Sequence, residues 1–121
     1  MTFSEIVLAS LAMVSKKDTD SDWAACKMGA LEILKNWTFS VKRLYLLYCE
    51  ANSVKPASFS GYGLNDTFAY GSDFATAAAT YVAMVLSPDK DRYKEIYDLL
   101  INDICLMCGS ESSRIVEVHR V

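Results

Sequence analysis

The stretch 87-SPDKDRYKEIYDLLINDICLMCG-109 decides the fold class, because it carries every signal of one long amphipathic helix. Ser87 is a typical N-cap residue, and Pro88 suits the first helical position, where its missing N–H costs nothing. Acidic residues follow in the first turn, and Gly109 is a typical C-terminal stop. The predicted buried face follows the helical period and consists of Tyr93, Ile96, Tyr97, Leu100, Ile104 and Met107.

Similar patterns precede this stretch, so we expect an all-α, single-domain bundle of four to five helices over residues 1–121. The other predicted helices run from about Ser4 to Lys16, from Asp20 or Ser21 to Asn36 or Trp37, from Ser40 to Ala51, and from Ser72 or Asp73 through Val85. Residues 110–121 are predicted to form a loose tail or a short strand.

Local signals support these helices. Thr2 and Glu5 form the capping-box pattern T-x-x-E before the first one. The third has an apolar stripe at helical spacing, namely Val41, Leu44, Tyr45, Tyr48 and Cys49. The many alanines of the fourth predict that another helix approaches it closely.

Composition limits the classes of function. Hydrophobic residues make up 52% of the chain, so disorder is not expected. Acidic residues outnumber basic ones by 15 to 12, giving a net charge of −3, and no basic stripe indicates nucleic-acid binding. The apolar run 6–14 is too short for a membrane span and lacks the basic residues that precede the core of a secretory signal. We therefore expect a cytoplasmic protein that binds neither membrane nor nucleic acid.

A long loop is predicted between the third and fourth helices, over residues 52–71, where no period is sustained. Its second half, 59-FSGYGLNDTFAYG-71, is rich in aromatic residues and glycine. Tyr, Ser, Gly and Asn are favoured in binding loops, and long loops in small domains are often functional. The alternative is that Phe59, Tyr62, Phe68 and Tyr70 fold inward and cap the bundle. The sequence leaves both readings open, and they can coexist.

Two motifs invite a reading as metal or redox sites. Cys105-x-x-Cys108 falls at a helix end, whereas a reactive thiol pair gains from a helix start, so two small buried hydrophobic residues are the simpler interpretation. Asp18, Asp20 and Asp22 match the first ligands of a calcium loop, but the loop's later glycine and glutamate are missing. We expect no metal, no cofactor and no enzymatic activity, although a redox or metal role for the cysteine pair stays open.

The function predicted from the sequence is recognition of another protein, most simply a basic one. The candidate contact residues are Tyr62, Asp66, Tyr70, Asp18, Asp20 and Asp22. Tyrosines would supply anchoring area, and the acids would speed encounter and set specificity. This profile resembles that of bacterial immunity proteins, which neutralise a toxin by direct binding; the resemblance lies in overall character, and no motif carries it. The alternative is a phage or viral accessory protein, or a homo-oligomeric structural module, a homodimer for example, that assembles through its apolar first helix.

Overall fold

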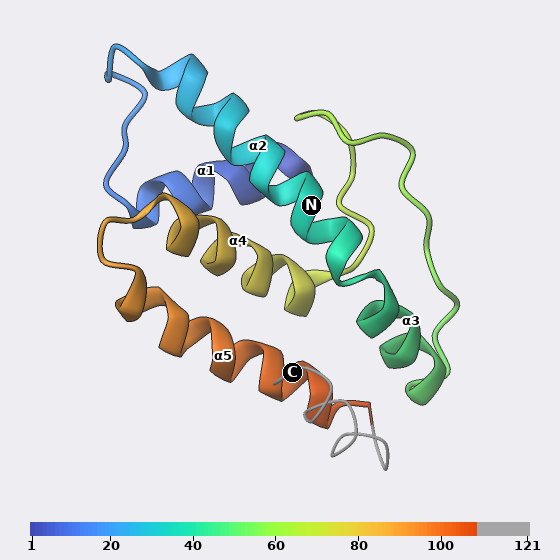
Figure 1. The fold of residues 1–121 in the computed structure, drawn as a ribbon. Coiled ribbons are helices and arrows are strands. Elements are labelled where there is room, and N and C mark those ends of the chain that lie inside the picture. Colours follow the sequence, from blue (N-terminus) through green and yellow to red (C-terminus); the bar gives the residue numbers. More distant parts are fainter. Residues whose placement is uncertain (109–121) are drawn as a thin grey trace.

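The structure, a computed structural model, describes residues 1–108 and confirms the predicted all-α bundle. Its five helices are α1 (Phe3–Met13), α2 (Trp23–Ser40), α3 (Lys42–Ala51), α4 (Ser72–Leu86) and α5 (Lys90–Leu106), as Figure 1 shows. Within this range there is no strand, only an isolated bridge between Thr2 and Thr67. The predictions for Gly109 and for residues 110–121 lie outside the described residues.

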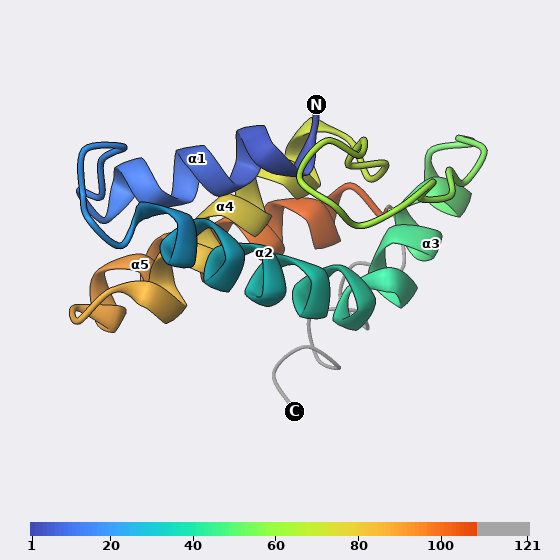
Figure 2. The ribbon, with the colours of Figure 1, turned by 90° about the horizontal axis from the view of Figure 1, so that it is seen from above.

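Helix α4 is the centre of the bundle and packs against α1, α2 and α5 (Figures 1 and 2). Its buried positions are mostly alanines: Ala75, Ala77, Ala78, Ala79 and Ala83. Small side chains let neighbouring helices approach closely, so the prediction made from these alanines is confirmed. The stripe of α3 is also confirmed, because Val41, Tyr45 and Cys49 are buried.

Several helix boundaries differ from the prediction. Helix α1 ends at Met13 instead of Lys16, and the N-cap of α2 is Asp22 instead of Asp20 or Ser21. Helix α2 continues to Ser40 instead of ending at Asn36 or Trp37. Helix α5 begins at Lys90 with Asp89 as its N-cap, so Ser87 is not the cap. The reason is local: the Ser87 hydroxyl accepts a hydrogen bond from the backbone N–H of Asp89 at 3.0 Å, which forms a turn before the helix.

The prediction of the buried face of α5 is also partly wrong. Ile96 and Met107 are 43% and 40% exposed, whereas Ile101 and Cys105 are almost fully buried. Helix α5 packs mainly on α4 at one side of the bundle (Figure 1), so its packed arc is narrower than its apolar arc and is rotated away from Ile96. An apolar stripe on α5 is consequently left at the surface.

Candidate functional site

The aromatic loop is fastened to the start of α1 by backbone hydrogen bonds. The N–H groups of Phe3 and Ser4 donate to the carbonyls of Asp66 at 3.0 Å and Leu64 at 2.8 Å. The N–H of Phe68 donates to the carbonyl of Met1 at 2.8 Å. The first N–H groups of a helix have no partner within the helix, so the loop supplies acceptors that α1 needs.

The predicted capping box completes this helix start. The backbone N–H of Glu5 donates to the hydroxyl of Thr2, and the backbone N–H of Thr2 donates to the Glu5 carboxylate, both at 3.2 Å. The loop and the capping box therefore hold the same helix end.

Most of the loop's aromatic side chains point inward. The ring of Phe3 has Phe59, Tyr62 and Phe68 within 5.7, 6.0 and 5.7 Å of its centroid. Tyr70 stacks on Tyr45 of α3 at 4.0 Å. This geometry agrees with the alternative interpretation of the loop, in which its own side chains fold inward and close one end of the core.

Tyr70 cannot supply contact area to a partner in this structure. Its side chain is only 7% exposed, and burial raises the pKa of its hydroxyl to about 12. The sequence left this inward orientation open as the alternative for Tyr70, whose ring packs against Tyr45 of α3 and against Phe59, Phe68 and Phe74. Tyr70 is therefore a residue of the core and leaves the set of candidate contacts.

Tyr62 and Asp66 lie at the surface of the cap. Tyr62 is half-buried, and its ring centroid is 5.0 Å from that of Phe39, which is 55% exposed. The half-buried Asp66 carboxylate accepts a hydrogen bond from the backbone N–H of Gly63 at 2.8 Å, so it also shapes the loop. Phe39 was missed from the sequence because the helix that presents it was predicted to end earlier.

Acidic residues stand on the segments that form the cap, whereas the exposed Lys42 and Arg43 follow Phe39 by three and four residues. Residues 1–15 and 56–88 contain no lysine or arginine. Two exposed acids stand here, Glu5 in the first turn of α1 and Asp73 in the first turn of α4. We call the surface formed by Glu5, Phe39, Tyr62, Asp66 and Asp73 the loop end.

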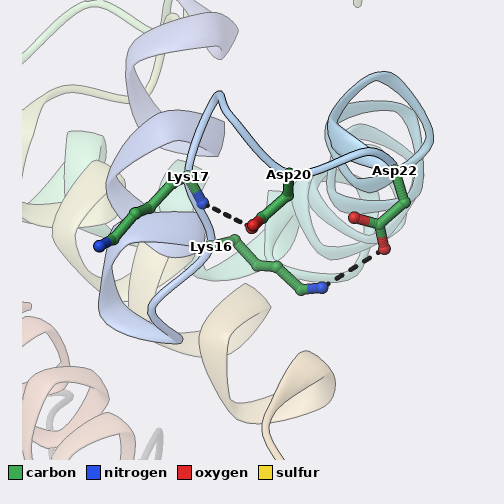
Figure 3. Close-up of polar contacts among 4 residues, drawn as sticks. All are labelled: Lys16, Lys17, Asp20 and Asp22. Carbon is green, nitrogen blue, oxygen red and sulfur yellow. Dashed lines mark hydrogen bonds and ion pairs between the residues drawn. The ribbon is translucent and has the colours of Figure 1, made fainter.

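Two of the three acids of turn 18–22, Asp20 and Asp22, bind different lysines and do not converge on one point (Figure 3), and the third, Asp18, is exposed. The Asp20 carboxylate accepts the backbone N–H of Lys17 at 2.9 Å, and Asp22 pairs with the ammonium of Lys16 at 3.3 Å. Hydrogen bonds from the thiol of Cys26 and from Lys16 lower the pKa of the Asp22 carboxyl. The ammonium of Lys16 therefore offsets the charge of Asp22, whereas Lys17 contributes only a backbone N–H to Asp20.

The two groups of candidate residues therefore form separate surfaces. The loop end lies at the N-terminus of α1 and turn 18–22 follows its C-terminus, as Figure 2 shows. The 11 residues of α1 separate them by about 16 Å.

The cysteine pair is buried. Burial raises the pKa of the Cys105 thiol to about 11, with the nearby Cys108 adding to the shift, and it also raises the pKa of Cys108. A thiol with a raised pKa has little thiolate at neutral pH, so neither is an activated nucleophile. Over residues 1–108, no three His, Cys, Asp or Glu side chains are grouped so that they could hold a metal ion.

Comparison with known protein families, with curated proteins and with solved structures gives no match to this chain. Among the helices of residues 1–108, none combines the length and apolar character that crossing a bilayer requires.

Proposed function

We propose that this chain is a protein-binding module that inhibits a basic protein, such as a toxin or an enzyme, by direct binding at the loop end. The proposal assigns the chain no catalytic activity. It also keeps a cytoplasmic location, with which the free thiols of Cys26, Cys49, Cys105 and Cys108 are compatible.

The observation that carries the proposal is an exposed aromatic pair at the end of the bundle where the acidic segments 1–15 and 56–88 meet. Phe39 and Tyr62 offer ring surface on a well-anchored cap, and aromatic anchors dominate the binding energy of many interfaces. The carboxylates of Glu5, Asp66 and Asp73 belong to segments 1–15 and 56–88, which contain no lysine or arginine. Such a surface matches a partner that presents basic residues around an apolar pocket.

Turn 18–22 has a secondary role in this proposal. An ordinary interface buries about 800 Å² on each partner, which corresponds to a patch about 30 Å across. One partner is large enough to reach from the loop end to this turn. Because Lys16 already pairs with Asp22, we expect the turn to affect the association rate more than the dissociation rate.

The test is affinity purification of the tagged chain from its own host, followed by titration of the purified candidate partner. Phe39→Ala removes an exposed ring from α2, and Met28→Ala is the matched control, because Met28 is 53% exposed on the same helix. We expect a basic protein to bind in equimolar amount, to be released as salt rises, and to lose at least about tenfold in affinity with Phe39→Ala only.

Three results would contradict the proposal. They are recovery of the chain alone, binding that does not change with salt, and equal effects of Phe39→Ala and Met28→Ala. Asp18→Lys distinguishes the two surfaces. If Asp18→Lys lowers the affinity for the partner and Phe39→Ala does not, the contact site is turn 18–22 and not the loop end.

A further inference from the structure

The exposed apolar stripe of α5 is the feature of the fold that the proposed function does not use. It consists of Ile96, Leu99, Leu106 and Met107, which are 43%, 62%, 58% and 40% exposed. The helical period places all four on one side of α5. Helix α4 packs against another side of α5, which lies at the edge of the bundle (Figure 1).

Two opposite charges flank the first half of this stripe. Arg92 and Asp103 are exposed, and they lie eleven residues apart, close to three helical turns, so they share the face of the stripe. Neither takes part in an ion pair within residues 1–108. Both are therefore available to a molecule that docks on the stripe.

The order of Arg92, Ile96, Leu99 and Asp103 in the first half of the stripe is self-complementary. The midpoint between Arg92 and Asp103 is also the midpoint between Ile96 and Leu99. If two copies of α5 pair antiparallel about a two-fold axis through this point, Arg92 of each copy faces Asp103 of the other. Ile96 then faces Leu99 twice. A surface that matches itself in this way fits the symmetric interface of a homodimer.

We propose that a second copy of this chain docks on the α5 stripe, forming an antiparallel α5–α5 homodimer with two Arg92–Asp103 pairs. One helix pair buries less area than an ordinary stable interface, so the dimer is weak and depends on protein concentration. The loop end lies on α1, α2, the loop and α4, outside this contact. The dimer is thus independent of partner binding.

The test is sedimentation equilibrium of the full chain from about 1 μM to about 1 mM, the range of a weak, small interface. Arg92→Asp and Asp103→Arg each place two like charges opposite each other and should weaken the dimer at least about tenfold. Mixing the two variants should restore association, because both pairs are attractive in the mixed dimer. Both changes suit the helix dipole, with an acid near its start and a base near its end, so folding is retained.

The matched controls are Arg43→Asp and Glu50→Arg, which make the same charge changes at exposed positions of α3. They should leave the dimer unchanged. A chain that stays monomeric at every concentration overturns the proposal. The stripe would then be covered by another protein or by another part of the chain. A dimer that persists in both α5 variants also overturns it, because another surface then carries the contact.

Discussion

The indole N–H of Trp37 donates a hydrogen bond of 2.8 Å to the hydroxyl of Tyr97, in a buried position that joins α2 to α5. The two side chains meet beside α4, whose Tyr81 packs against both rings, at 6.4 Å from Trp37 and 5.3 Å from Tyr97. A buried donor that loses its partner bears the full cost of desolvation. Removal of the Tyr97 hydroxyl should therefore lower the free energy of unfolding, because the Trp37 N–H would stay buried without an acceptor.

Tyr97→Phe should destabilise the fold by about 1 to 3 kcal/mol, because it leaves the Trp37 N–H buried without an acceptor. Urea denaturation followed by far-UV circular dichroism measures the loss. The matched control is Tyr81→Phe, which removes a hydroxyl from the neighbouring ring and should cost clearly less. Equal losses for both variants would show that the Trp37–Tyr97 bond contributes no specific stability.

Stability should fall in alkaline solution because Tyr97 has a raised pKa. Burial raises the pKa of Tyr97 to about 12, from an ordinary value near 10. Between these values the folded chain holds a proton that the unfolded chain has released, so stability decreases as pH rises. The loss amounts to at most about 2 to 3 kcal/mol by pH 12.

This loss can be assigned to one residue by comparing urea midpoints at pH 8 and pH 11. Tyr70, Cys105 and Cys108 add drops of the same sign, since burial raises the pKa of Tyr70 to about 12, that of Cys105 to about 11 and that of Cys108 as well. Tyr97→Phe should therefore show a smaller alkaline decrease than the unchanged chain. If Tyr97→Phe loses as much stability between pH 8 and pH 11 as the unchanged chain, the pKa of Tyr97 is the same in the folded and the unfolded chain.

Two serines occupy backbone conformations that favour glycine. Ser15 follows α1 with φ 63°, and Ser53 follows α3 with φ 55°. After Ser15, the N–H of Lys16 donates back to the carbonyl of Leu11 at 2.9 Å, which is the Schellman arrangement of a helix end. A residue with a Cβ is strained in this left-handed region.

Ser15→Gly should consequently raise the free energy of unfolding by about 0.5 to 1 kcal/mol, the strain relieved being partly offset by a more flexible unfolded chain. Ser53→Gly should act in the same direction. Ser21→Gly is the control, because Ser21 is exposed in a turn without positive φ. Thermal unfolding of the three variants compares them directly, and a Ser15→Gly chain no more stable than Ser21→Gly would contradict the assignment of strain.

The close packing of α4 predicts low tolerance for larger side chains. Ala78 is fully buried where α4 meets its neighbours, whereas Ala24 is exposed on α2. Ala78→Leu should cost about 1 to 3 kcal/mol or more through overpacking, and Ala24→Leu should be near neutral. Differential scanning calorimetry of the two variants tests this, and a neutral Ala78→Leu would show that the bundle around α4 is loosely packed.

The sequence predicts these helices well because their signals are local. The stripe on α3 and the alanines of α4 are repeated at the helical period, and a neighbour is needed only to cover them. Helix α5 is different, since it has apolar residues on two adjoining arcs, one with Tyr97 and one with Ile96. Only the position of α4 decides which arc is buried, and no pattern within α5 contains that information.

The geometry of the candidate site depends on other helices for the same reason. Whether Tyr70 points inward depends on Tyr45 of another helix, and whether Phe39 is presented depends on where α2 ends. The sequence did indicate that the aromatic loop is distinctive. It could not show that the loop's carbonyls complete the start of α1, because backbone acceptors have no side-chain signature.

Gly61 and Gly29 differ in the space available for an added side chain, and substitution by alanine should therefore have opposite effects at the two positions. A Cβ added at Gly61 would lie 2.6 Å from a carboxylate oxygen of Asp66, the residue that binds the Gly63 N–H, whereas one added at Gly29 meets nothing within 4 Å. Gly29→Ala in helix α2 should therefore stabilise the fold by about 1 kcal/mol.

Gly61→Ala should instead displace the Asp66 carboxylate and cost about 1 kcal/mol, the value of one lost hydrogen bond. Hydrogen exchange locates the damage: because the Asp66 carbonyl also accepts the Phe3 N–H, amides at the start of α1 should exchange faster in Gly61→Ala and not in Gly29→Ala. Unchanged exchange at Phe3 and Ser4 would show that the loop does not hold this helix end.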